Sequence, residues 1–283
     1  MRILVTGANG FSARHLIGHL SEQGCGEVYC AGLRPTRDAN FFQCDLTREN
    51  KVAELIARAE PDQIYHLAGT FTNDYQTDYA ANVLCSRSLL ETVRRTRRPC
   101  RILLVGSCAE YGLVAAEDNP VKEEHQLLPV SIYGLTKVYQ TYLAKFYVIV
   151  HKLDVVMARP FNLLGRGISS RLFVGHVYGQ IEAYRKGEIA NVSVGDLESR
   201  RDYIAVEDAM RAYAVIMQRG VTGEVYNVGS GFSIKIRDLL ERMLKENGLG
   251  MDAVTQMHPA AGDKLDVRDL FADISKFRSL ENR

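Results

Sequence analysis

Tyr133 and Lys137 stand four positions apart, in a segment that begins at Ser131. On a helix this spacing places both side chains on one face, about one turn apart. A lysine ammonium there favours the tyrosinate, which lowers the pKa of a phenol that ordinarily titrates near ~10. Such a pair could transfer a proton at neutral pH. The same spacing also occurs in amphipathic helices whose lysine only covers apolar surface, so the surrounding elements must decide.

The N-terminal stretch predicts a dinucleotide site. Residues 2–6 are an apolar run typical of a buried parallel strand, and the turn after it carries Gly7, Asn9, Gly10 and Phe11. Apolar residues at helical spacing follow. A glycine turn between a strand and a helix lets backbone approach a pyrophosphate, which the helix N-terminus binds. The spacing here is G-x-x-G-x-x-A rather than G-x-G-x-x-G.

The ends of the next two strands bear on the choice of cofactor. The strand expected over 27–33 leads into Arg34, and no carboxylate appears before Asp38. An acidic residue at this point favours NAD, whereas a nearby arginine accommodates the 2′-phosphate of NADP. We therefore favour NADP(H), with NAD(H) as the alternative. A third strand over 41–46 brings Asp45 to its end, where it could bond adenine. Equally, Asp45 or Thr47 could cap a helix over 48–59.

Ser107 follows a fifth apolar strand over 102–106, at the sheet edge where open α/β sheets bind ligands. The fourth strand, over 62–69, contains His66, which we interpret as a core histidine. A helix over 77–97 carries Asn82, an amide suited to bonding backbone near the site. Tyr133 and Lys137 lie on a helix over 131–150, and a sixth strand follows over 153–158.

Alternating strands and helices predict a doubly wound Rossmann parallel sheet with a smaller C-terminal substrate-binding lobe. We expect residues 1–160 to form the dinucleotide-binding domain, with about 203–228 returning to it. Residues 161–202 and 229–283 would form the lobe. Its expected elements are a helix over 171–186, a strand over 190–194 and a helix over 235–246, whereas a helix over 206–218 and a strand over 224–228 belong to the returning segment.

Charge and cysteine usage exclude several classes of protein. The 283 residues carry a net charge of +1, which argues against a nucleic-acid or membrane partner. The basic run over 94–98 fits the negative end of a helix dipole. Six scattered cysteines lack metal-ligand spacing, so we expect reduced thiols, no metal site and a cytoplasmic protein. The sequence contains no run of about 18 apolar residues, so we expect no membrane span.

Taken together, these motifs resemble the extended short-chain dehydrogenase/reductase family of nucleotide-sugar epimerases, dehydratases and reductases, over nearly the whole chain. The matching segments are 6–11, 45–46, 66–68, 111–112, 133–137, 159–162, 201–202 and 226–229. The resemblance implies that Tyr133 is the acid/base at a sugar hydroxyl or ketone and that Lys137 binds the nicotinamide ribose. Ser107 would bond the same sugar oxygen. It further implies cofactor contacts from Leu46, Leu67, Ala68 and Pro160, and substrate contacts from Asn162 and Arg201.

The residues after Ser107 narrow the implied chemistry to one carbon. In this family, a sugar 4,6-dehydratase places an acid two positions after the serine or threonine, whereas Cys108 and Ala109 cannot move a proton in that way. Glu110 comes next, but in an extended segment it would point to the opposite side. We therefore disfavour 4,6-dehydration and keep 4-keto reduction or 4-epimerisation.

Segments 106–112, 129–134 and 194–202 are similar to the branch of reductases that act on GDP-4-keto-6-deoxymannose. The resemblance thus favours NADPH-dependent reduction of the C4 ketone of a nucleotide-linked 4-keto-6-deoxy sugar. An NAD-dependent 4-epimerase is the alternative, and a catalytically inactive cofactor-binding protein is disfavoured. Near their C-terminal end these reductases carry an arginine that binds phosphate or ribose. It is missing here, and Lys264 or Arg268 could substitute for it. The family and the apolar surface of the Tyr133 helix also predict a homodimer through helices near 77–97 and 131–150.

Overall fold

The computed structural model describes residues 1–257 and 269–282. Its central sheet is parallel and contains seven strands. The strands are β1 (Arg2–Thr6), β2 (Glu27–Gly32), β3 (Phe41–Gln43), β4 (Gln63–His66), β5 (Arg101–Val105), β6 (Val155–Pro160) and β11 (Val225–Val228). They lie in the order β11-β6-β5-β4-β1-β2-β3. The order reverses at β1, which has β2 on one side and β4 on the other. The predicted doubly wound fold is therefore confirmed, and ligands bind at such a switch point.

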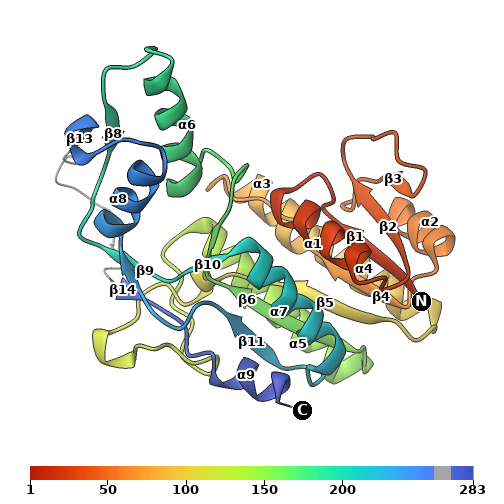
Figure 1. The fold of residues 1–283 in the computed structure, drawn as a ribbon. Helices are drawn as coiled ribbons and strands as arrows, with labels where there is room; N and C mark the ends of the chain where they lie inside the picture. The colour runs from red at the N-terminus through yellow and green to blue at the C-terminus, as the bar shows by residue number, and fades with distance from the viewer. Residues whose placement is uncertain (258–268, 283) are drawn as a thin grey trace.

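Helices cover both faces of this sheet (Figure 1). One face holds α1 (Phe11–Glu22), α7 (Val206–Arg219) and α9 (Ser275–Glu281), and the other holds α2 (Glu49–Ala59), α4 (Cys85–Thr96) and α5 (Ile132–His151). Because successive strand residues point to opposite faces, β5 sends Leu103 into the first core and Ile102 and Leu104 into the second. The strands are thus buried on both sides, as their apolar runs predict.

The helix expected over 77–97 changes its winding near its start. It comprises α3 (Tyr75–Tyr79), a π-helical turn (Ala80–Leu84) and α4. Asn82 lies in that turn and is buried. Its amide accepts from Thr70 N at 3.0 Å and donates to Thr70 O at 3.0 Å and Thr136 Oγ1 at 2.9 Å. The π turn thereby holds the loop after β4 against α5, as π-bulges often do at functional sites.

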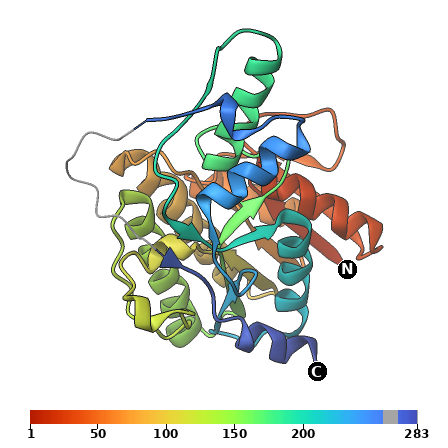
Figure 2. The same ribbon diagram turned by 60° about the vertical axis from the view of Figure 1, so that its left-hand side comes forward.

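A smaller layer of elements stands beyond the carboxyl edge of the sheet, with its own apolar core (Figures 1 and 2). It contains α6 (Phe173–Arg185), β8 (Val192–Val194), α8 (Ile236–Glu246) and β13 (Val254–Gln256). Short strands lie between the two parts: β7 (Asn162–Leu164), β10 (Tyr203–Ala205), β9 (Arg200–Arg201), β12 (Ile234–Lys235) and β14 (Asp269–Leu270). β11 joins the main sheet beside β6, while α9 packs on α7 and β11 rather than on this layer. The division into two domains stays a prediction.

The basic run is engaged in ion pairs. Arg94 and Arg95 contact Glu91 at 2.7 and 2.9 Å, and Arg98 contacts Asp62 at 3.1 Å. All six cysteines are free thiols. Within residues 1–257 and 269–282, no helix has the length and apolar character needed to cross a membrane.

Candidate active site

A cleft of about 640 Å³ opens at the carboxyl edge of the sheet, between the glycine turn and the smaller layer. Loops that follow β1, β4, β5 and β6 contribute to its walls. It therefore occupies the place where a doubly wound sheet binds ligands. Among the residues singled out in the sequence, it brings together Gly7, Gly10, Phe11, Leu67, Ser107, Tyr133, Lys137, Pro160 and Asn162.

The glycine turn at one end of the cleft fits a dinucleotide pyrophosphate. Gly7 has φ +70°, and a Cβ there would lie 2.7 Å from Ala68 N, so only glycine is accommodated. Gly10 donates its N–H to Gly7 O at 2.8 Å, which closes the turn. No side chain in the described part of the chain caps the start of α1. Its first N–H groups face the cleft at the positive end of the helix dipole, where an anion is stabilised.

Ser107 lies two residues after the end of β5 and is held in a capping box. Its hydroxyl oxygen accepts the N–H of Ala109 at 3.2 Å, and its own N–H is donated to Glu110 Oε1 at 2.8 Å. The segment Cys108–Glu110 is a 3₁₀ turn, not the extended segment considered from the sequence. Because the hydroxyl oxygen accepts a backbone N–H, its proton is left to donate into the cleft toward Tyr133.

Tyr133 lies in the first turn of α5, which begins where Ser131 accepts the N–H of Gly134 at 3.0 Å. Burial raises the pKa of Tyr133 above its ordinary value, and a hydrogen bond with Ser107 offsets this in part. The net pKa of Tyr133 is thus raised, whereas the lysine spacing predicts a lowered one. Loss of solvent dominates here, and the Lys137 ammonium nitrogen lies 5.9 Å from the ring centre.

Lys137 is buried one turn further along α5. Its ammonium donates to Val105 O and to Gln140 Oε1, both at 2.9 Å. Burial lowers the pKa of Lys137 to about 8. Two of its three N–H bonds have protein acceptors, and the third is left to bond a ligand hydroxyl in the cleft.

Behind Lys137, a buried chain of polar groups leads back to β1. Gln140 donates to Ser86 Oγ at 2.7 Å, Ser86 contacts His66 Nε2 at 2.9 Å, and His66 Nδ1 contacts Thr6 Oγ1 at 2.8 Å. Burial lowers the pKa of His66 to about 3, so its ring is neutral. His66 is therefore the core histidine expected from the sequence, and it fixes the scaffold beneath the cleft.

Residues 3–229 match the family model described as the NAD dependent epimerase/dehydratase family. The chain belongs to that family. It is 31% identical over 246 residues, covering 85% of this chain and 78% of its relative, to a GDP-6-deoxy-D-mannose reductase from Pseudomonas aeruginosa.

Solved structures agree on the fold. RMD from Pseudomonas aeruginosa complexed with NADPH superposes with a TM-score of 0.84 at 24% identity, covering 100% of this chain and 91% of that one. A UDP-glucose 4-epimerase from Thermotoga maritima, solved with UDP-glucose, gives a TM-score of 0.87 at 25% identity over 99% and 93% of the two chains. The family member described here is accordingly an NAD(P)-dependent oxidoreductase with the extended short-chain dehydrogenase/reductase fold.

A nicotinamide dinucleotide fits the residues of this family member. The glycine turn offers a backbone cradle and a helix N-terminus for its phosphates, and Lys137 offers a free N–H for a ribose hydroxyl. No group of three or more His, Cys, Asp or Glu side chains suited to a metal exists among residues 1–257 and 269–282.

Some predicted cofactor residues of the enzyme lie outside the cleft lining. The Asn9 amide bonds Arg34, accepting its N–H at 3.1 Å and donating to its carbonyl at 3.1 Å, which anchors that loop to the glycine turn. The Arg34 side chain is exposed. Asp45 accepts the N–H and hydroxyl of Thr47, at 3.0 and 2.7 Å, just before α2 begins. Among the described residues no side chain caps α2, whose N-cap is Arg48, so the cap considered from the sequence is not formed and Asp45 makes a local turn instead.

Three further predicted site residues lie in the core or beside the cleft. Leu46 is buried in the core, and Ala68 lies partly buried against the same core, next to Gly7. Arg201 lies on β9, two residues before Tyr203 of the cleft wall, and donates to Arg200 O at 2.7 Å. Lys264 and Arg268 fall outside the described residues.

The enzyme's cleft also contains residues that motif matching did not single out. Phe71 meets the Tyr133 ring edge-on with centroids 5.9 Å apart, and Arg171, Leu172 and Tyr203 form the wall under the smaller layer. None of these residues directly follows a predicted strand or belongs to a short motif, so the sequence alone did not indicate them. Gln140 could have been found, because it lies three positions after Lys137 on the same helix face.

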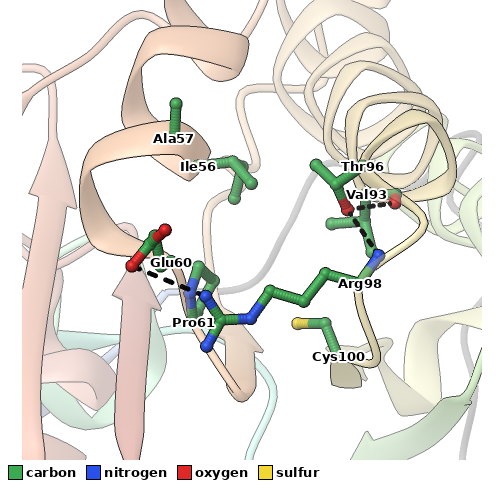
Figure 3. Close-up of a pocket in the computed structure, with 8 residues that line it drawn as sticks. All are labelled: Ile56, Ala57, Glu60, Pro61, Val93, Thr96, Arg98 and Cys100. Carbon is green, nitrogen blue, oxygen red and sulfur yellow. Dashed lines mark hydrogen bonds and ion pairs between the residues drawn. The ribbon is translucent and has the colours of Figure 1, made fainter.

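A second hollow, of about 210 Å³, lies at the opposite end of the sheet, between the ends of α2 and α4 (Figure 3). Its polar groups are already paired, since Arg98 contacts Glu60 at 3.6 Å. It is remote from the strand ends that carry the chemistry of this oxidoreductase. Its lining comprises Ile56, Ala57, Glu60, Pro61, Val93, Thr96, Arg98 and Cys100.

Proposed function

We propose that the enzyme reduces the C4 ketone of a nucleotide-linked 4-keto-6-deoxy sugar with NADPH, and that the sugar is GDP-4-keto-6-deoxymannose. The observation that carries the proposal is the cleft lined by Ser107 and Tyr133, to which the described part of the chain contributes no Asp, Glu or His side chain. The 31% identity to a GDP-6-deoxy-D-mannose reductase supports the GDP-linked sugar.

The cleft around Ser107 supports a reaction that moves one proton. Cys108 and Ala109 line it where a dehydratase requires an acid, and burial raises the pKa of the Cys108 thiol to about 12. Glu110 is fully buried, is absent from the cleft lining, and contacts Arg159 at 2.9 Å. Because no carboxylate among residues 1–257 and 269–282 lines the cleft to remove a C5 proton, the reaction should be confined to C4, and reduction of a C4 ketone fits it.

In this reaction each residue has a separate task. The Ser107 hydroxyl donates a hydrogen bond to the C4 oxygen and orients the carbonyl. Tyr133 gives its phenolic proton to that oxygen as the new C–H bond forms, which leaves an alcohol. Lys137 holds the nicotinamide ribose and stabilises the transient tyrosinate by its charge. When bound, the reduced nicotinamide supplies the hydride. Asn162 and Arg201 are proposed to hold the substrate, with Arg201 at the pyrophosphate.

Reduction and 4-epimerisation differ in how they use the cofactor and the proton. A reductase gives a proton to the ketone and consumes its hydride. A 4-epimerase begins by removing the C4 hydroxyl proton and recycles its hydride, so net oxidation of NADPH separates the two reactions.

NADPH is proposed over NADH because the loop after β2 presents Arg34 and no carboxylate before Asp38. The Arg34 side chain is exposed, and its backbone is fixed by Asn9. A guanidinium placed there favours a 2′-phosphate.

The test is to supply purified enzyme with GDP-4-keto-6-deoxymannose and either NADPH or NADH. We expect one NADPH oxidised per ketone reduced, and a loss of at least about 10²-fold in kcat for Tyr133→Phe, in line with general acid catalysis. Cofactor released from the denatured enzyme distinguishes the alternative. Tightly held NAD, with sugar interconversion and no net NADPH oxidation, would identify a 4-epimerase. Nucleotide-sugar binding without turnover of any ketone would favour an inactive protein.

A further inference from the structure

Glu110 is a fully buried carboxylate that bonds three elements of the active site at once. Its Oε1 accepts the N–H of Ser107 at 2.8 Å. Its Oε2 accepts the hydroxyl of Thr141 at 2.8 Å and a guanidinium N–H of Arg159 at 2.9 Å. Ser107 follows β5, Thr141 lies on α5, and Arg159 lies on β6.

Each of those elements carries a different part of the chemistry. α5 bears Tyr133 and Lys137, and β6 ends at Pro160, two residues before Asn162. The Glu110 carboxylate therefore joins Ser107 to the helix that bears Tyr133 and to the strand that leads to Asn162. Helices and strands bonded to one charged group cannot shift relative to one another without breaking a charge-assisted hydrogen bond.

The Glu110 carboxylate is packed tightly between Arg159 and the backbone of Gly106. Arg159 is 2% exposed at its side chain, and its guanidinium also lies 4.5 Å from the centre of the Tyr111 ring. A Cβ on Gly106 would collide with Glu110 Oε1, so the glycine leaves room for the carboxylate against the strand. Both oxygens of the Glu110 carboxylate accept hydrogen bonds, while Arg159 Nε has no hydrogen-bond partner among the described residues. A buried carboxylate bonded at both oxygens is held in place, and breaking one of those bonds is costly.

We propose that Glu110 is a positioning residue, whose carboxylate sets Ser107 and the Tyr133 helix at the separation that proton transfer requires. It does not touch substrate or cofactor, and it acts through Ser107 and Thr141. Its effect is on the chemical step, since misplacement of reacting groups lowers the rate even when the ligands still bind. This inference rests on the proposed roles of Ser107 and Tyr133.

The test uses Thr141, because replacing it keeps the buried charge pair intact. Thr141→Val retains the volume and removes the hydroxyl bond to Glu110, whereas Thr141→Ser retains the hydroxyl. We expect Thr141→Val to lower kcat roughly threefold to tenfold, the size of one hydrogen bond, with KM for both ligands within about twofold. Thr141→Ser should keep kcat within about twofold of the original enzyme. Glu110→Gln, if it folds, should lower kcat further.

A double variant separates positioning from a general loss of structure. If Glu110 and Thr141 act through Ser107, Thr141→Val should lower kcat by a smaller factor in the Ser107→Ala enzyme than in the unaltered enzyme. An unchanged kcat in Thr141→Val, an equal loss in Thr141→Ser, or full additivity with Ser107→Ala would overturn the proposal. The assay uses any nucleotide-sugar ketone that the unaltered enzyme reduces. Failure of the GDP sugar therefore counts against the proposed substrate and not against Glu110.

Discussion

The ammonium of Lys137 donates a hydrogen bond of 2.9 Å to the side-chain oxygen of Gln140, three residues further along α5. The amide nitrogen of Gln140 in turn donates to Ser86 at 2.7 Å, so the amide is held in one orientation. A neutral acceptor stabilises the ammonium less than a carboxylate would. Lys137 consequently keeps the lowered pKa of about 8 that burial imposes.

This pair predicts the pH dependence of catalysis. In the role proposed for Lys137, the ammonium is the form that binds the ribose and stabilises tyrosinate. The value of kcat/KM should therefore be level below pH 8 and fall above it, where Lys137 loses its proton. Gln140→Glu places a carboxylate beside the ammonium and should raise the pH at which kcat/KM falls by about one unit or more. Gln140→Leu removes the acceptor and should lower that pH. If kcat/KM, measured from pH 6 to 10, falls at the same pH in all three enzymes, Lys137 is not the group whose titration causes the fall.

The buried thiols predict a loss of stability in alkali. Burial raises the pKa of Cys30 and Cys44 to about 11 and that of Cys85 to about 12. In the unfolded chain these thiols ionise near ~8.5, so between that pH and 11 the folded state binds more protons. The free energy of unfolding should therefore fall with rising pH, by about 1.4 kcal/mol per unit for each titrating thiol. Urea unfolding at pH 7.5 and 9.5 measures this, and Cys85→Ala should lessen the fall.

Arg34 predicts the preference for NADPH. Arg34→Ala should raise KM for NADPH roughly tenfold or more, the size of one charged hydrogen bond, and leave KM for NADH nearly unchanged. Arg37→Ala is the matched control, since it removes an exposed arginine from the same loop without altering the residue that Asn9 anchors. Equal losses for both cofactors would show that Arg34 does not read the 2′-phosphate.

An exposed apolar stripe on α5 predicts a homodimer. Tyr142, Phe146 and Ile149 are 60%, 50% and 67% exposed, and Tyr139 of the same helix contacts Tyr79 of α3 edge-on at 6.4 Å. Such a stripe marks an interaction surface, and a second copy of the chain could bury it. Light scattering should give twice the chain mass at micromolar concentration, and Ile149→Glu should give the monomer. Val221→Glu, at a 49% exposed site elsewhere, should stay dimeric. A monomeric unaltered protein would contradict the prediction.

The sheet and its strand ends were predictable because their signals are local. Apolar runs separated by helical periodicity placed β1, β4, β5 and β6 within a few residues, and Ser131 marked the start of α5. Strand ends then placed Ser107 and the glycine turn at one edge. The π turn over 80–84 was not predicted, because its winding depends on the contacts of Asn82 with Thr70 and Thr136.

Long-range pairing explains the rest of what the sequence could not reveal. Glu110 and Arg159 are 49 residues apart, and nothing local indicates that their side chains meet inside the protein. Asp202 is similar. Its carboxylate accepts N–H groups of Ser230 and Ala272 at 2.7 and 3.1 Å, so it joins segments far apart in the chain. The rise in the pKa of Tyr133 was missed for the same reason, since burial depends on packing and not on spacing.

The most direct measurement follows the hydride. With NADPH carrying deuterium at the transferable C4 position and GDP-4-keto-6-deoxymannose as substrate, mass spectrometry and NMR locate the label in the sugar. The account predicts one deuterium at C4 of a GDP-6-deoxy sugar for each NADPH oxidised, and no label at C5 or C6. Product that forms without deuterium, or with solvent hydrogen newly incorporated at C5, would contradict it.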